Sequence, residues 1–169
     1  MVRRFNRTIS LLLPALLLTQ LLWAQDEEME DGTAPDFVLK STAGSNLRLS
    51  EYRGEVAMLV FWASWCGECR SQLQAFDELH TAYGESGLRL LSVSLDSSIG
   101  QARETAESLS LSFPVLHDGF GDVAEMYEVD DLPMVAFVDR EGRVRQTVEG
   151  YSRAEHEAFV DSLRNLLRE

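Results

Sequence analysis

The chain has 169 residues, 15 Lys+Arg against 28 Asp+Glu, a formal net charge of −13 and only two cysteines. The length suits one ordinary domain with a sizeable core, and 45% hydrophobic with 25% charged residues is a globular composition. A single lysine, Lys40, argues against nucleic acid as a partner, because phosphate binding needs clustered Lys and Arg. Two cysteines are too few for a multi-disulfide scaffold. Together with three histidines, they are also a poor set of ligands for a closed zinc site.

The start of the chain has the pattern of a secretory signal. Three arginines precede a leucine-rich run over residues 9–24, which is shorter than the roughly 20 apolar residues of a membrane-spanning helix. Ala24 offers a small residue before a cleavage point, although Leu22 is bulky at the third position before it. We therefore interpret residues 1–24 as a signal peptide or, if uncleaved, an N-terminal anchor in the inner membrane. Either one places the cysteines in the oxidising periplasm.

The remaining chain divides into a short linker and one domain. Residues 25–34 (QDEEMEDGTA) are acidic, lack an apolar pattern and are interpreted as a linker. Residues 35–169 alternate strand and helix signals and end in a strand pair and a helix. This order predicts an α/β domain with a central mixed sheet and helices on both sides.

The first elements of the domain have clear boundaries. Two short apolar pieces, 37–39 and 47–49, flank a polar turn and predict a β-hairpin. The continuous apolar run Val56–Trp62 predicts a strand buried on both faces. Apolar residues then recur at helical spacing over 67–83, with either Leu79 or His80 facing inward, and Gly84 is expected to end this helix.

The second half of the domain continues the alternation. The predicted elements are a strand over 88–95, a helix over about 100–109, a short strand or turn over 113–117, a short helix over 121–127, strands over 134–139 and 144–149, and a C-terminal helix. A capping box at residues 152–155 opens the last helix. Its inward-facing residues are expected to be Phe159, Val160, Leu163, Leu166 and Leu167.

Both cysteines lie in the segment Trp65–Cys69 (WCGEC), where the buried strand passes into a helix. Unpaired N–H groups and the dipole at a helix N-terminus stabilise an anion, so the pKa of a thiol at Cys66 is expected below the value of about 8.5 for free cysteine. Two intervening residues on a helical turn bring Cys69 within disulfide reach. Cys66 is therefore the expected nucleophile, and Cys69 the residue that resolves a mixed disulfide.

The segment Phe61–Arg70 (FWASWCGECR) resembles the active-site segment of the thioredoxin superfamily. With the signal, the hairpin, Leu49–Gly54 (LSEYRG) and Phe113–Leu116 (FPVL), the chain is similar to exported TlpA/ResA/CcmG-like thiol-disulfide oxidoreductases over nearly all of 35–169. The resemblance implies a thioredoxin-like three-layer fold, in which helices flank a central mixed β-sheet and an N-terminal β-hairpin is an extension.

The resemblance also implies a substrate-binding turn. Asp131–Met134 (DLPM) matches the position of the family's cis-proline, which lies against the dithiol and helps bind an extended substrate backbone. The substrate-binding residues expected on this basis are Trp65, Gly67, Glu68, Leu132 and Pro133. No metal and no cofactor other than the redox-active Cys66–Cys69 disulfide are expected.

The chain departs from the family at two positions that concern proton transfer. Val60 stands where thioredoxins have a buried aspartate, and Gln72 where many ResA-like proteins have a glutamate. Proton transfer to and from Cys69 is therefore expected to use water, Glu68 or another group.

The leading hypothesis is a periplasmic thiol-disulfide oxidoreductase, a monomer that reduces or exchanges disulfides in exported proteins. The family implies apocytochrome c as one possible substrate and a membrane thiol-disulfide protein as the electron donor. A peroxiredoxin-like peroxidase is an alternative, although Ala63 stands where such enzymes have a threonine. A copper metallochaperone using Cys66, Cys69 and His117 is the other.

Overall fold

The computed structural model describes residues 32–150, 152 and 156–169. The proposed signal segment, linker residues 25–31 and residues 153–155 of the expected capping box lie outside the described residues. Among the residues that the structure describes, no helix is both long and apolar enough to cross a membrane.

A seven-stranded mixed sheet forms the centre of the domain, with strand order β2-β1-β5-β4-β3-β6-β7. The central strands β5, β4 and β3 are parallel to one another, and all other neighbouring pairs are antiparallel. The strands are β1 Val38–Ser41, β2 Asn46–Arg48, β3 Val56–Trp62, β4 Leu88–Ser94, β5 Val115–His117, β6 Met134–Val138 and β7 Val144–Glu149.

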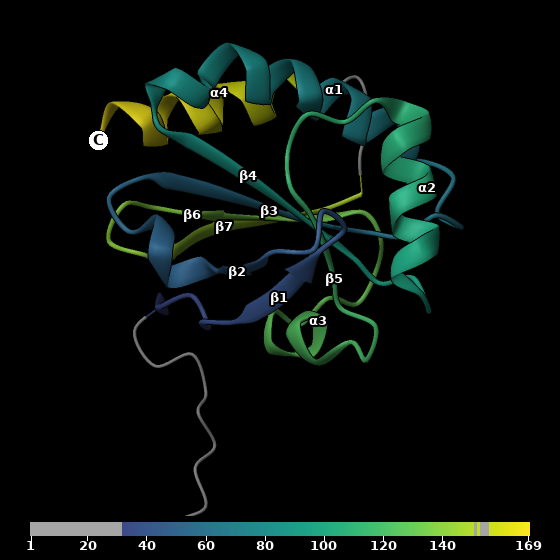
Figure 1. The fold of residues 1–169 in the computed structure, drawn as a ribbon. Helices are drawn as coiled ribbons and strands as arrows, with labels where there is room; N and C mark the ends of the chain where they lie inside the picture. The colour runs from purple at the N-terminus through teal and green to yellow at the C-terminus, as the bar shows by residue number, and fades with distance from the viewer. Residues whose placement is uncertain (1–31, 151, 153–155) are drawn as a thin grey trace, which may run out of the picture.

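Helices cover both faces of this sheet (Figure 1). The helices α1 and α4 cover one face, and α3 lies on the other (Figure 1). Their bounds are α1 Cys69–Tyr83, α2 Ile99–Leu109, α3 Asp122–Met126 and α4 His156–Arg168, with short 3-10 helices η2 Leu49–Tyr52 and η3 Gly84–Ser86. The expected three-layer arrangement is thus confirmed.

Strand β3 is buried at all seven positions because both of its faces meet a hydrophobic cluster. Side chains alternate between the faces of a strand, so Met58 and Trp62 belong to the cluster under α1 and α4, whereas Leu59 and Phe61 belong to the cluster over α3. The central strand is therefore held firmly from both sides, which fixes the point where the chain leaves it after Trp62.

The cluster on the α1 and α4 face is built on aromatic packing. Phe159 of α4 stacks on Phe76 of α1 with ring centroids 4.8 Å apart, and it also contacts Phe137 of β6 at 4.8 Å. Of the five residues expected to face inward on the last helix, four are buried, and Leu167 is half-buried against the same cluster.

Tyr127 ties the N-terminal segment to the opposite cluster. Its ring lies 6.2 Å from that of Phe37 and 5.5 Å from that of Phe61, and its hydroxyl donates a hydrogen bond to the Pro35 carbonyl at 2.8 Å. Burial raises the pKa of the Tyr127 hydroxyl. The hydroxyl is therefore a neutral donor that fixes the chain where it enters the first hairpin.

The predicted elements are all present, with shifted ends. The hairpin pairs Leu39 with Leu47, but Leu49 already belongs to η2. The helix expected from residue 67 begins at Cys69, since its first helical bond runs from the Gln72 N–H to the Glu68 carbonyl. It ends before Gly84, and Leu79 is the buried member of the pair that the spacing left open.

Two further differences have local causes. The helix expected from residue 100 begins at Ile99, because Ser98 and Gln101 form a capping box that the sequence reading did not identify. The segment expected over 113–117 becomes a strand only from Val115 onward, after a proline that has no N–H to donate.

We expect Leu163→Ala to lower the free energy of unfolding by about 2 to 5 kcal/mol, because Leu163 is wholly buried in the aromatic cluster. Leu167→Ala on the same helix is the matched control and should cost clearly less, since Leu167 is only half-buried. Urea unfolding of the two variants measures both losses. Equal losses would contradict the packing described for α4.

Candidate active site

Cys66 lies between the end of β3 and the start of α1, and it forms a disulfide with Cys69, with Cα atoms 5.4 Å apart. Cys69 is the first residue of α1 and is wholly buried, whereas Cys66 is 7% exposed. A thiol approaching from solvent therefore meets Cys66 before Cys69. The roles of Cys66 as nucleophile and of Cys69 as resolving residue stay predictions, which this order of exposure favours.

The start of α1 is directed at the Cys66 sulfur. The Cys69 N–H donates to Cys66 Sγ at 3.2 Å, and the Cys66 N–H donates to the Ala63 carbonyl at 3.1 Å. Free N–H groups and the dipole at a helix N-terminus favour negative charge. The Cys69 N–H is placed to donate to the Cys66 sulfur when that sulfur carries negative charge.

A buried carboxylate, Asp96, holds the loop that carries Cys66. Asp96 follows β4 and is 1% exposed. Its Oδ1 accepts hydrogen bonds from the N–H of Ser64 at 3.0 Å and from the Ser64 hydroxyl at 2.6 Å. Its Oδ2 accepts from the Ser94 hydroxyl at 2.8 Å. Hydrogen bonds to an ionised acceptor are the stronger kind, so the residue two places before Cys66 is firmly fixed.

Asp96 also contacts the last residue of β5. His117 Nε2 lies 2.9 Å from the Asp96 backbone carbonyl and donates to it. The sequence reading did not identify Asp96 as a site residue. The sequence does contain one signal: Asp96 is an acidic residue immediately after the apolar run predicted as a strand over residues 88–95.

The turn before β6 lies beside the end of β3. Met134, the first residue of β6, pairs with Phe61. The Leu132–Pro133 peptide bond is cis, as the resemblance led us to expect. Pro133 is buried, and its carbonyl accepts a hydrogen bond from the Gly150 N–H at 2.8 Å, while Leu132 is half-buried. Two of the expected substrate-binding residues thus lie next to the strand that leads to the cysteines.

The other three expected substrate-binding residues face solvent around the disulfide. Trp65 is 71% exposed, and Gly67 and Glu68 are exposed as well. A Cβ added to Gly67 would meet no atom within 4 Å, so this glycine leaves open space beside the cysteines. Trp62, by contrast, is fully buried and packs in the core.

Gln72 lies one helical turn after Cys69 and is 1% exposed. Its Oε1 has no hydrogen-bond partner among the described residues. It lines a cavity of 210 Å³ between α1, β7 and α4, together with Val148 and Phe159. A neutral amide therefore occupies the position where many ResA-like proteins have a glutamate.

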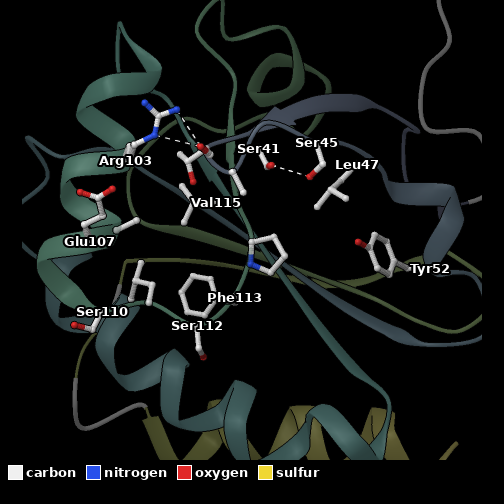
Figure 2. Close-up of a pocket in the computed structure, with 15 residues that line it drawn as sticks. Ser41, Ser45, Leu47, Tyr52, Arg103, Glu107, Ser110, Ser112, Phe113 and Val115 are labelled. Atoms are coloured by element: carbon white, nitrogen blue, oxygen red, sulfur yellow. Dashed lines mark hydrogen bonds between the residues drawn. The ribbon is translucent and has the colours of Figure 1, made fainter.

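A larger cavity of 580 Å³ lies away from the cysteines (Figure 2). It opens between the first hairpin, α2 and the start of β5, with Phe113 and Val115 among its lining residues. Arg103 donates two hydrogen bonds to the Thr42 carbonyl at its rim (Figure 2). None of the expected site residues lines this cavity. Among the described residues, no group of three His, Cys, Asp or Glu side chains could hold a metal ion.

The fold and the cysteine pair define a thioredoxin-like protein with a redox-active disulfide. The model of the AhpC/TSA family matches residues 31–147, more than half of the chain. The chain belongs to the AhpC/TSA family.

Individual relatives indicate which kind of thioredoxin-like protein this chain is. Thiol-disulfide oxidoreductase ResA of Geobacillus kaustophilus is 36% identical over 118 residues, which are 70% of this chain and 68% of that protein. ResA of Bacillus subtilis is 28% identical over 148 residues, 87% of this chain and 81% of that protein. A crystal structure described as the thiol:disulfide interchange protein DsbE of Chlorobium tepidum matches with a TM-score of 0.77 and 32% identity, over 80% of this chain and 95% of that one. These relatives confirm the expected class, a thiol-disulfide oxidoreductase of thioredoxin-like fold.

We expect the stability effects of Ser64→Ala and Asp96→Ala to be coupled, because one hydrogen bond at 2.6 Å joins the two side chains. A double-mutant cycle from urea unfolding should give a coupling energy of about 0.5 to 3 kcal/mol. Ser71→Ala is the control, since the Ser71 hydroxyl bonds the Glu68 carbonyl instead. Strictly additive effects of the first two substitutions would show that Asp96 does not hold this loop.

Proposed function

We propose that this thiol-disulfide oxidoreductase works in the periplasm, where it reduces or exchanges disulfides of exported proteins, apocytochrome c among them. Its electrons would come from a membrane thiol-disulfide protein, and the chain would act as a monomer without a metal. The observation that carries the proposal is the disulfide at the start of α1, with Cys66 more accessible than Cys69. The signal pattern of residues 1–24 supports the location.

The reaction is a pair of thiol-disulfide exchanges. The Cys66 thiolate attacks one sulfur of the substrate disulfide, a Cys66–substrate disulfide forms, and the other substrate sulfur leaves as a thiolate and takes up a proton. Cys69 then loses its proton and attacks the Cys66 sulfur, which releases the second substrate thiolate. Two electrons have passed to the substrate, whose two sulfurs take up one proton equivalent to that lost by Cys69 and one from water, and the Cys66–Cys69 disulfide remains for the electron donor to reduce.

The exposed residues around the disulfide are suited to bind the substrate. We assign substrate contact to Trp65, Gly67 and Glu68 beside the disulfide, and to Leu132 and Pro133 in the turn before β6. The pairing of Met134 with Phe61 supports this assignment, because that turn then lies beside β3, the strand that precedes the cysteines. An extended substrate segment can thus contact both loops.

Proton exchange at Cys69 has few candidate groups. The neighbouring Gln72 is buried but has no ionisable proton, and Val60 is an apolar residue of the core. Glu68 directly precedes Cys69 and is exposed. We therefore assign the proton released by Cys69 to water or to the Glu68 carboxylate.

The two alternatives gain no support from the site geometry. Ala63, at the position of the peroxidase threonine, is a buried residue without a hydroxyl. His117, the third copper ligand considered, uses Nε2 to contact the Asp96 carbonyl. Thiol-disulfide exchange is the function that the arrangement supports best.

Replacing the two cysteines one at a time should have opposite consequences. We expect Cys66→Ser to reduce turnover of a disulfide substrate to the uncatalysed background, because the accessible nucleophile is lost. Cys69→Ser should instead accumulate a mixed disulfide with the substrate, visible as a heavier band on non-reducing electrophoresis. Turnover by Cys66→Ser at the wild-type rate would refute the mechanism.

The direction of electron flow is open to a direct measurement. If the protein is a reductase, as we propose, the Cys66–Cys69 couple should have a reduction potential near the value of about −270 mV for thioredoxin. Equilibration with glutathione buffers of known ratio measures it. A potential near about −120 mV would indicate an oxidase and contradict the proposed direction.

A further inference from the structure

Two exposed aromatic side chains lie on the same edge of the sheet as the disulfide. Trp65 is 71% exposed after β3, and Phe120 is 96% exposed after β5. Strands β3, β4 and β5 are parallel neighbours, so the loops that follow them leave the same edge. With neighbouring strands about 4.8 Å apart, the ends of β3 and β5, from which the two loops leave, are separated by about 10 Å, the length of about three extended residues.

Hydrogen bonds through Asp96 connect the loop after β3 to the last residue of β5. Asp96 accepts from the N–H of Ser64, the residue before Trp65, and its carbonyl accepts from His117, three residues before Phe120. The two aromatic residues therefore follow points of the fold that are held in a fixed relation to each other.

The loop that carries Phe120 is firmly built. Asp118 is 4% exposed, its N–H donates to the Ser94 carbonyl at 2.9 Å, and its Oδ2 accepts from the Ala124 N–H at 2.9 Å. Gly121 has φ +79° and donates its N–H to the Asp118 carbonyl. A Cβ at Gly119 would lie 2.6 Å from the His117 ring, so the glycine permits this ring to pack against the loop. An ordered loop loses little backbone freedom when the side chain that it presents binds a partner.

The chain around Phe120 is acidic. From residue 117 to 139 there are seven Asp or Glu and no Lys or Arg. Five of these carboxylates are exposed, and within the described residues none of the five takes part in an ion pair: Asp122, Glu125, Glu128, Asp130 and Asp131. Lys40, opposite His117 on β1, and the exposed Arg70, directly after Cys69, contribute positive charge to the same end of the sheet. The acidic stretch starts next to Phe120 and ends at the turn beside β3, so negative charge lies beside both loops.

We propose that Trp65 and Phe120 form a docking surface for a basic, extended polypeptide segment that carries the disulfide exchanged at Cys66. The inference rests on the proposed function and names its substrate class. An apolar side chain of the segment would pack on Phe120, and its Lys or Arg residues would meet the unpaired carboxylates. A second copy of this chain is a poor occupant, because two acidic surfaces would repel each other.

Peptide substrates test the charge preference. Two short synthetic peptides each contain one internal disulfide and one leucine. The flanking residues are Lys in one (the Lys peptide) and Glu in the other (the Glu peptide). At low ionic strength, we expect the reduced wild-type protein to react with the Lys peptide with a kcat/KM about tenfold higher than with the Glu peptide. At 1 M salt, where the Debye length is about 3 Å, the difference should largely disappear. Equal values for the two peptides at low salt would overturn the proposal.

Variants test the residues. For each variant, kcat/KM for the Lys peptide is divided by kcat/KM for neutral hydroxyethyl disulfide. We expect Phe120→Ser to lower this ratio about tenfold, because one aromatic anchor is lost. Tyr52→Ser, an aromatic substitution at the opposite edge, is the matched control. Asp122→Lys with Asp130→Lys should reverse the preference between the peptides, whereas Glu141→Lys in the distant turn after β6 should not. Equal effects of Phe120→Ser and Tyr52→Ser would refute the role of Phe120.

A binding measurement separates docking from chemistry. Calorimetric titration of the oxidised protein with the Lys peptide, its cysteines replaced by serine, should give a Kd about tenfold tighter than for Phe120→Ser. If wild-type protein binds this peptide but does not reduce hydroxyethyl disulfide, the proposed function fails while the docking surface stands. If it reduces hydroxyethyl disulfide, but reacts equally with the two peptides and binds the Lys peptide no more tightly than Phe120→Ser does, docking alone fails. Concentration-dependent dimerisation that Phe120→Ser abolishes would assign the surface to a second copy instead.

Discussion

The geometry of the site depends on one buried carboxylate. Asp96 accepts hydrogen bonds from Ser64 and Ser94, and its backbone carbonyl accepts one from His117, so it joins the loop after β3 to the last residues of β4 and β5. A buried charge is costly unless it is fully hydrogen-bonded, and here those bonds also fix the loop that carries Cys66. The reactive sulfur therefore has a defined position although it lies between secondary-structure elements.

Charge is distributed unevenly between the two ends of the sheet. At the end away from the cysteines, Arg145 pairs with Asp139 and with Glu169, which ties β7 to the last residue of the chain. At the cysteine end, the exposed carboxylates between Phe120 and Pro133 have no such partners among the described residues. Ion pairing thus serves the fold at one end, and the negative charge at the other remains available to a partner.

The sequence was most informative where local pattern and burial agree. The run Val56–Trp62 predicted a strand buried on both faces, and the position of Pro133 predicted a cis bond through the family resemblance; both are confirmed. The predicted start of α1 was two residues too early, because the spacing of apolar residues does not locate the first helical hydrogen bond. Asp96 and Phe120 could not be identified, since their importance comes from strands that become neighbours only in the folded sheet.

The complete burial of Cys69 has a consequence for how the protein recovers from errors. Any stray thiol or unsuitable partner that becomes covalently attached must do so at Cys66, where Cys69 is one helical turn away. Such an adduct can always be displaced from within by the second sulfur, without help from another enzyme. The sequence has no third cysteine at which such an adduct could be held.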